Sequence, residues 1–328
     1  MKFKIIISSL LFSWMICYAL QSAAQSVPAE GEHIDFLMTF GNRAEKTWGD
    51  DDHVQTYFFA IPKTQTQAIY IRIFDPTTSG KYDQINNQFN TKTKFSVFGG
   101  KGAYSDKDSR NIDPVGNYKA GNLLASHTFG NEVMYDDGWY SFGPFNPQEG
   151  ESANELSAYV LKIIAEGIEG DDGNAYRYYL SSDAKTNKPI EGGNGFAYEM
   201  SFRLLYNNNE KAHIYPFVDK NVTALKQSNF DFDNDGEIRV TSRTKKSHPM
   251  EASGDGTWIS STEQIDESEH NTSLDIQLIK KGQKPNDMVF YLTNQYNQSI
   301  PFFSLPLGGI PKYKYKVDMQ LKIIDVTK

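Results

Sequence analysis

Cysteine is nearly absent from this chain of 328 residues, since Cys17 is the only one. It lies inside an apolar run from Ile5 to Leu20, which follows a basic start and precedes the small residues Ala23 and Ala24. This arrangement is typical of a secretory signal peptide, so we expect residues 1–24 to be removed and no disulfide to form in the mature chain. Export without disulfides is more typical of bacterial envelope and secreted proteins than of eukaryotic ectodomains.

Long apolar runs are absent after residue 24, so we expect no membrane span in the mature chain. An excess of basic residues is absent as well. The chain has 33 Lys and Arg against 41 Asp and Glu, a formal net charge of −8, and removal of Lys2 and Lys4 with the signal peptide makes it −10 (−8 − 2). Such an acidic surface disfavours nucleic acids and anionic membranes as partners.

Motifs of nucleophilic and zinc catalysis are also missing. The sequence contains no Gly-x-Ser-x-Gly elbow, and its histidines stand apart, without the spacing that zinc ligands require. A polysaccharide hydrolase needs two carboxylates on either side of a sugar, and nothing singles out such a pair among 41 acidic residues. We therefore predict a non-catalytic protein and keep a polysaccharide hydrolase as the least favoured alternative.

A sustained helical period is missing too. Only Leu156–Glu166 fits a helical face, and it fits a strand equally well, so the turn chemistry at Gly170–Asn174 leads us to expect a hairpin with Ala175–Leu180. Elsewhere apolar and polar residues alternate, as in Ala68–Phe74, which predicts half-buried strands. The segment Lys312–Ile323 alternates most clearly, and its row of lysines predicts an edge strand.

Short alternating strands between Gly, Asp and Asn turns predict an all-β fold. We expect two antiparallel β-sandwich domains, of the jelly-roll or immunoglobulin-like kind, at residues 25–212 and 213–328. The two halves share this style of strand and turn but no residue-level identity, so the sequence alone does not indicate a repeat.

The turn most crowded with carboxylates lies in Phe230–Val240, where Asp231, Asp233 and Asp235 alternate before Gly236 and Glu237. Calcium prefers several oxygen ligands, and alternating aspartates can direct theirs inward while glycine allows a sharp bend. We therefore predict a calcium site at Asp231, Asp233, Asp235 and Glu237. The alternative is a plain hairpin turn, because Asp-Gly between apolar runs is a strong hairpin signal without any metal.

The spacing Asp-x-Asp-x-Asp-Gly resembles the first half of an EF-hand or dockerin loop, which implies calcium as the ligand. The resemblance covers about seven residues. With Asp231 as the first position, Ser242 stands at the twelfth, where the family places a bidentate Glu, and no helical pattern flanks the turn.

Related acidic turns recur at Gly49–His53, Asp136–Trp139 and Gly170–Asn174. Like charges gathered at one end of a sandwich repel unless a cation or solvent screens them. We therefore predict a second, weaker calcium site in the first domain, drawn from Asp50, Asp51, Asp52, Asp75, Asp171, Asp172 and Asn174. The alternative is that these acidic loops are simply solvated.

The many aromatic residues supply material for large cores, and we expect Trp258 to anchor the core of the second domain. The alternative is that Trp48, Trp139 and Trp258 form a platform for sugars, which would make the protein carbohydrate-binding. In composition and strand pattern the chain resembles the β-sandwich modules of large Gram-negative envelope proteins. That resemblance implies an exported protein, periplasmic, surface-bound or secreted, whose partner is an envelope or surface protein or a glycan.

Overall fold

The computed structural model describes residues 26–48, 53–205 and 211–308. The predicted signal peptide, Asp50, Asp51, Asp52 and the predicted edge strand Lys312–Ile323 lie outside these residues. Among the described residues no helix combines the length and the apolar character needed to cross a membrane. The regular structure consists of strands and of short 3₁₀-helices: η1 (Glu30–Glu32), η2 (Lys46–Trp48), η3 (Asp108–Arg110), η4 (Val133–Tyr135), η5 (Pro147–Glu149) and η6 (Glu267–Glu269).

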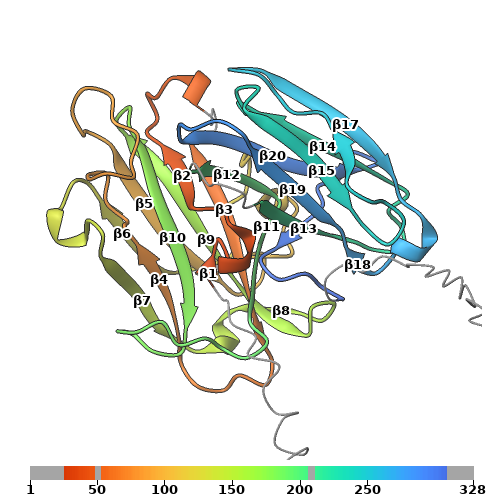
Figure 1. The fold of residues 1–328 in the computed structure, drawn as a ribbon. Coiled ribbons are helices and arrows are strands. Elements are labelled where there is room, and N and C mark those ends of the chain that lie inside the picture. The colour runs from red at the N-terminus through yellow and green to blue at the C-terminus, as the bar shows by residue number, and fades with distance from the viewer. Residues whose placement is uncertain (1–25, 49–52, 206–210, 309–328) are drawn as a thin grey trace, which may run out of the picture.

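Two antiparallel sheets face each other, which confirms the predicted all-β sandwich (Figure 1). One sheet has nine strands in the order β17-β14-β20-β12-β2-β10-β4-β7, with β1 (Ser26–Val27) also paired to β10. The other has twelve strands in the order β16-β15-β19-β13-β21-β11-β3-β9-β5-β6. Its remaining two strands are β18 (Thr272–Ser273), which pairs with β13, and β8 (Glu151–Ala153), which pairs with β9.

The amino-terminal half supplies eight strands that form two four-stranded layers, β7-β4-β10-β2 and β6-β5-β9-β3. Successive strands change layer at every step except β5–β6, which form a hairpin within one layer, as in an eight-stranded jelly roll. We call this set the first jelly roll. Its strands are β2 (Phe36–Phe40), β3 (Val54–Pro62), β4 (Ile69–Phe74), β5 (Lys92–Gly99), β6 (Asn122–Phe129), β7 (Trp139–Phe145), β9 (Ala158–Glu169) and β10 (Gly173–Ser181).

The carboxy-terminal half repeats this topology strand for strand, with layers β17-β14-β20-β12 and β16-β15-β19-β13. The six strand pairings within the first jelly roll each have a counterpart here, for example β4–β10 and β14–β20. We call this set the second jelly roll. Its strands are β12 (Glu199–Leu204), β13 (Ala212–Val218), β14 (Ala224–Phe230), β15 (Gly236–Thr241), β16 (His248–Met250), β17 (Trp258–Gln264), β19 (Asp275–Lys280) and β20 (Asn286–Asn294).

The two jelly rolls are joined side by side through both sheets. In one sheet β2 pairs directly with β12, so that Leu37 lies opposite Phe202. In the other, β11 (Asn194–Ala197) and β21 (Phe302–Phe303) connect β3 to β13. The largest hydrophobic cluster runs through both halves, so they share one core. The predicted boundary between residues 212 and 213 stays a prediction, although hydrogen bonding crosses it in both sheets.

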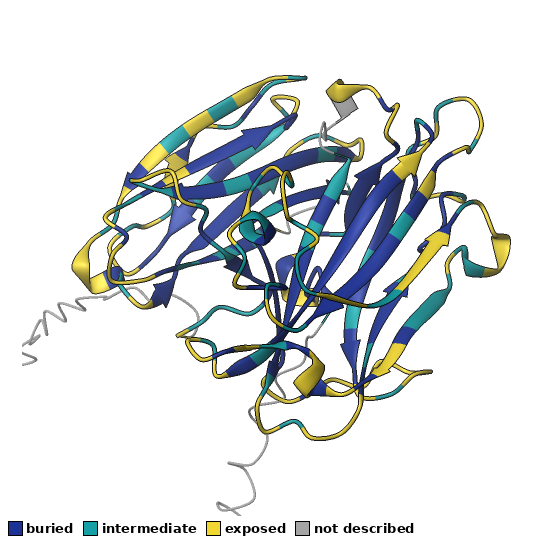
Figure 2. Ribbon diagram, turned by 180° about the vertical axis from the view of Figure 1, so that it is seen from behind, coloured by how far each residue is buried: buried dark blue, intermediate teal, exposed yellow. Residues whose placement is uncertain are grey.

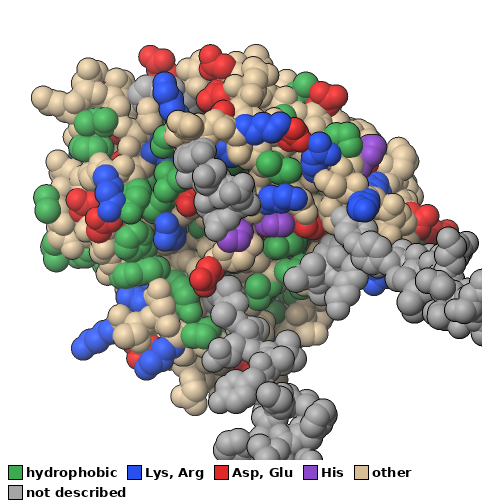
Figure 3. All heavy atoms as spheres, viewed as in Figure 1, with side chains coloured by type: hydrophobic (Ala, Val, Ile, Leu, Met, Phe, Trp, Pro, Cys, Tyr) green, Lys and Arg blue, Asp and Glu red, His purple; other side chains and the backbone are tan. Residues whose placement is uncertain are grey.

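The alternation of apolar and polar residues along the strands accounts for most of the burial of their side chains. Every second residue of β13 is buried, and the isoleucines of β4 are fully buried, as period-two strands with one covered face require. Figure 2 shows the buried residues concentrated in the middle strands of the sheets and the exposed residues on edge strands and loops. In Figure 3 acidic and basic side chains are mixed over the face shown, while hydrophobic ones gather where β4, β6 and β7 lie.

The expected hairpin between Leu156–Glu166 and Ala175–Leu180 is wrong. Both segments are strands, but β9 pairs with β3 and β5, whereas β10 pairs with β4 and β2 in the other sheet. The Gly170–Asn174 turn therefore carries the chain from one layer to the other. A turn signal predicts a reversal of the chain but not whether the next strand stays in the same sheet.

Candidate metal centre

The acidic turn at Asp231 connects β14 to β15 and so crosses from one sheet to the other. It is therefore a corner between layers, not the hairpin that the Asp-Gly signal suggested. Asp231, Asp233 and Asn234 have φ angles of 61°, 54° and 53°, in the left-handed region that Asp and Asn tolerate better than most residues. Between them Phe232 is fully buried and fixes the turn to the core.

A second loop, between β16 and β17, holds the corner in place. The Phe232 N–H donates to Ser253 Oγ at 2.9 Å, and the Asn234 N–H donates to the Ser253 carbonyl at 3.1 Å. Further along the loop the Gly256 N–H donates to Asp231 Oδ1 at 2.7 Å. These bonds bring Asp255 beside the corner, although it is far from Asp231 in the sequence.

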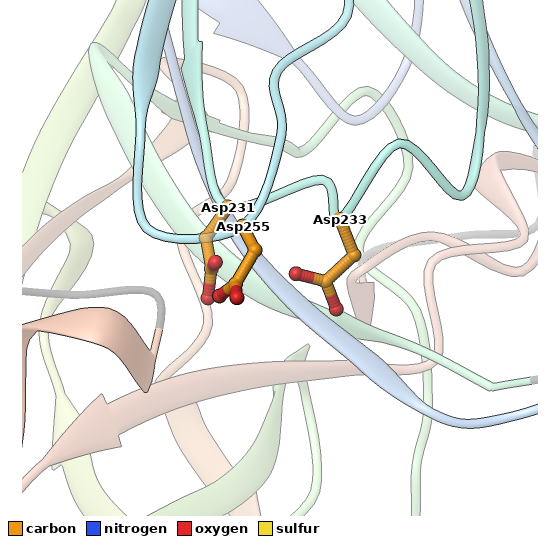
Figure 4. Close-up of side chains that lie close together, drawn as sticks. All are labelled: Asp231, Asp233 and Asp255. Carbon is orange, nitrogen blue, oxygen red and sulfur yellow. The ribbon is translucent and has the colours of Figure 1, made fainter.

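The carboxylates of Asp231, Asp233 and Asp255 gather at this point, with oxygens that all lie within 4.8 Å of one another. Figure 4 shows Asp231 and Asp255 side by side, with Asp233 turned toward them across the turn. Asp231 is buried, whereas Asp233 and Asp255 are exposed. Burial, together with the charges of its two neighbours, raises the pKa of Asp231 to about 7.

Asn286, at the start of β20, completes the group. Its side-chain Nδ2 donates to the Asp231 carbonyl at 3.0 Å and to Asp233 Oδ2 at 3.1 Å. The residue is only 3% exposed, yet its Oδ1 has no hydrogen-bond partner among the described residues. An unpaired buried amide oxygen costs free energy, so it marks a place where a donor or a cation would be favourable. We call Asp231, Asp233, Asp255 and Asn286 the Asp231 site.

The other two residues predicted for this site point elsewhere. Asp235 pairs with the nearly buried Lys280. Glu237 pairs with Lys281 and, at 2.7 Å, with Arg239. Each of these carboxylates already has a cationic partner, which leaves Asp231, Asp233 and Asp255 as the carboxylates of the corner that have no ion pair among the described residues.

The residues predicted for a first-domain site fall into two groups. Asp171 and Asp172 bind the loop before β5: Asp172 accepts N–H bonds from Asn86, Asn90 and Thr91, at 2.7–3.1 Å. The Asp171 carboxylate accepts bonds from the Asn86 and Asn90 side chains, at 3.2 Å and 2.6 Å. Both carboxylates therefore serve as hydrogen-bond acceptors that hold this loop in place.

Asp75 and Asn174 form the other group. Asp75 directly follows the end of β4, and Asn174 Nδ2 donates to the carbonyl of the next residue, Pro76, at 2.9 Å. The structure thus places Asn174 against the residue that follows Asp75 and directs Asp171 and Asp172 to the loop before β5.

Sequence reasoning missed Asp255 and Asn286. Asp255 lies in the Asp-Gly stretch of a charged loop and Asn286 precedes an alternating strand, so each carried a weak local signal. Nothing local indicates that a loop before β17 and the start of β20 meet at the end of β14. That contact follows from the strand order β17-β14-β20.

Trp258 lies close to the Asp231 site and does not anchor the core as expected, because it is 45% exposed. It stands opposite Phe230 on β14, and its ring centroid is 5.2 Å from that of Phe230 and 5.4 Å from that of Tyr291. Trp139 is partly buried against Phe74. The side chain of Trp48 lies outside what the structure describes.

Comparisons with known proteins leave the chain without an assigned family. No protein-family model matches it, and no curated protein matches it. Among solved structures, that of the Macrobrachium rosenbergii nodavirus matches with a TM-score of 0.17 and 8% sequence identity, over 80% of this chain and 88% of the viral one. A likeness this low does not bear on the fold or the function.

Proposed function

We propose that this protein is an exported, non-catalytic protein of the bacterial cell envelope or surface, with a binding or structural role. We further propose that calcium at the Asp231 site fixes the corner between its sheets. The observation that carries the proposal is the group of three carboxylates without an ion pair beside a buried amide oxygen without a partner. The signal-peptide pattern at residues 1–24 and the absence of cysteine after it support the location.

The chemistry of the Asp231 site favours a hard cation. Its donors are carboxylate, amide and carbonyl oxygens, which suit calcium, and calcium commonly completes its shell with water. Rotation of the Asn286 amide by half a turn would direct Oδ1 instead of Nδ2 at Asp233, which is favourable only when a cation lies between them. Neutralising the carboxylates would also remove the repulsion that contributes to the raised pKa of Asp231.

Thermal unfolding of the chain from Gln25 onward, first in EDTA and then in calcium, tests the proposal. Calcium at 100 times its Kd adds about 2.7 kcal/mol to the free energy of unfolding, which corresponds to a rise in Tm of roughly 5–10 °C. The double variant Asp233→Asn with Asp255→Asn should lose the part of the rise that comes from the Asp231 site.

Asp235→Asn is the matched control, because Asp235 lies in the same corner but is paired with Lys280. It should keep the calcium response even if its Tm in EDTA changes. A wild type without any response, or a response of the same size in the wild type and the double variant, would exclude calcium from this site.

A carbohydrate-binding role is the second candidate. The half-exposed ring of Trp258 and the neighbouring Tyr291 form an aromatic surface beside the acidic corner, and aromatic rings of this kind stack on sugars. Screening the wild type on a glycan array in calcium and in EDTA tests this role. Binding that Trp258→Ala removes and Trp139→Phe retains supports it, whereas an array without any binding counts against it.

A further inference from the structure

The first jelly roll has a corner whose aspartate, asparagine and aromatic neighbours occupy the same positions as those of the Asp231 site. β4 ends at Phe74 and Asp75 follows, just as β14 ends at Phe230 and Asp231 follows. Asp75 has a φ of 54°, close to the 61° of Asp231. Asp75 Oδ1 accepts a backbone N–H from Asp137 at 3.2 Å, in the loop before β7, as Asp231 does from the loop before β17.

The neighbours of the two corners also match. Phe74 lies opposite Trp139, and their ring centroids are 5.3 Å apart, which corresponds to the contact between Phe230 and Trp258. On its other side Phe74 pairs with Arg177 of β10, three residues after Asn174. Phe230 pairs with Val289 of β20, three residues after Asn286. Asn174 and Asn286 therefore occupy equivalent positions.

Buried oxygens without hydrogen-bond partners concentrate at the corner of the first jelly roll. Of the described residues, five contribute such atoms here: Asp75 Oδ2, Thr77 Oγ1, Thr78 Oγ1, Ser79 Oγ and Asn174 Oδ1. All but Ser79 belong to residues that are fully buried. Asn174 donates its Nδ2 to Pro76 and Thr93, so its Oδ1 is the part of the side chain left over, as it is in Asn286.

Asp75 is a buried carboxylate with charges of both signs near it, Lys81 and Arg177 among the cations. Burial raises the pKa of Asp75 to about 7, and the nearby carboxylates of Asp136 and Asp137 add to the effect. The ammonium group of Lys81 lies 3.8 Å from Asp137 and is well exposed, and the guanidinium of Arg177 donates to the carbonyl of Asp35. No ion pair formed by the described residues involves Asp75, so its charge is buried without a direct counterion. A buried carboxylate of this kind is costly unless a cation compensates it.

We propose that this corner is a second site for a hard cation such as calcium, formed by Asp75, Thr77, Thr78, Ser79 and Asn174, which we call the Asp75 site. Asp75 supplies the charged ligand, and the amide and hydroxyl groups supply neutral oxygens of the kind that calcium accepts. Each jelly roll then carries one cation at the point where its chain crosses between the sheets. The inference stands on the oxygens of this corner and does not require the Asp231 site to be occupied.

Metal content after EDTA treatment and equilibrium dialysis against calcium provides the first test. We expect two calcium ions per chain in the wild type. One should remain in Asp75→Asn and one in the double variant Asp233→Asn with Asp255→Asn. Because asparagine has the shape of aspartate without its charge, Asp75→Asn should also melt in EDTA at or above the Tm of the wild type. If the carboxylate had only a structural role, Asp75→Asn would instead melt below the Tm of the wild type in EDTA.

Terbium, which takes calcium sites and emits when a nearby tryptophan is excited, distinguishes the two corners. Trp139 adjoins the Asp75 site and Trp258 adjoins the Asp231 site. We expect Trp139→Phe to remove the terbium emission from the Asp75 site and Trp258→Phe to remove the emission from the Asp231 site. Thr78→Val, which keeps the shape of the side chain and removes one hydroxyl, should weaken terbium binding in the Trp258→Phe background several-fold.

The outcomes separate the two proposals. One ion per chain that only the Asp233 and Asp255 substitutions remove overturns the Asp75 site and leaves the proposed function intact. One ion that only Asp75→Asn removes supports the Asp75 site and overturns the calcium role of Asp231. No bound calcium overturns both, and two ions that Asp75→Asn does not reduce overturn the Asp75 site.

Discussion

Lys162 offers a test of the structure that involves no ligand. The side chain lies on β9 and is fully buried, and its ammonium group donates to Ser109 Oγ at 2.7 Å and to the carbonyls of Tyr118 and Ala120 at 2.5 Å and 2.8 Å. It thereby holds the long loop between β5 and β6 against the sheet. Burial lowers the pKa of Lys162 from 10.5 to about 8, although Asp106 and Glu151 act in the opposite direction.

This lowered pKa makes stability depend on pH in a defined window. Between pH 8 and 10.5 the unfolded chain binds the Lys162 proton more tightly than the folded chain, so the free energy of unfolding rises with pH. The contribution from pH 8 to pH 10 is about 2 kcal/mol, given the two pKa values. Above about pH 10 the buried Tyr57 and Tyr178, whose pKa values are raised by burial, reverse the trend, because only the unfolded chain loses their protons.

Guanidinium unfolding of the wild type and of Lys162→Met at pH 8, 9 and 10, in EDTA and followed by tryptophan fluorescence, measures this effect. The variant leaves two carbonyls without a donor, so it should be less stable at pH 10 by roughly 2–4 kcal/mol. The difference should shrink toward pH 8, where the wild type must bury a charge. Lys119→Met is the control, because Lys119 is half exposed and pairs with Glu166. Parallel pH profiles for the wild type and Lys162→Met would refute the reasoning.

Three further predictions concern residues that hold strands, loops and turns of the fold in place. Arg203 binds Asp287 in a buried two-pronged pair at 2.6 Å and 2.5 Å, so Arg203→Met should cost about 3–5 kcal/mol in denaturant unfolding. Adding Asp287→Asn should recover part of that loss, and no recovery would contradict the pair. Glu151 accepts N–H bonds from residues 102, 104 and 105 at 2.6–3.1 Å. Glu151→Ala should therefore speed amide hydrogen exchange in that loop, and unchanged exchange there would count against this anchor. Asn234 has a left-handed φ of 53°, so Asn234→Ala should lower stability by about 1 kcal/mol while Asn234→Gly stays near the wild type. Equal losses in both variants would show that the side chain rather than the backbone matters.

The strands were predictable because their signal is local. Alternation in β4 and β13 reflects one covered face, and an all-β sandwich follows from many such segments. The pairing was not predictable, because it depends on which sheet receives each strand. Gly170–Asn174 and Phe230–Val240 both carried strong hairpin signals, and both turned out to join the two layers. Turn residues report local backbone angles, and those are similar in a hairpin and in a corner.

The candidate site was predictable in part for the same reason. Asp231 and Asp233 stood out because they lie close together in one short turn. Asp235 and Glu237 lie in the same acidic stretch, but they pair with Lys280 and Lys281 at the end of β19. Ion pairs between separate segments carry no signal in the spacing of either one. Asp255 and Asn286 could be assigned to the site only from the strand order, which brings three connections to one corner.

The repeated corner explains why the two halves share a style but no alignable sequence. In both of these corners a left-handed residue follows the strand immediately, and Asp supplies that conformation at Asp75 and Asp231. Once an aspartate is placed there, the layer behind it buries part of its charge, and the adjoining strand presents an asparagine three residues from the pairing partner. The fold therefore constrains only a few positions around each corner, while the strands between them are free to vary as long as they alternate.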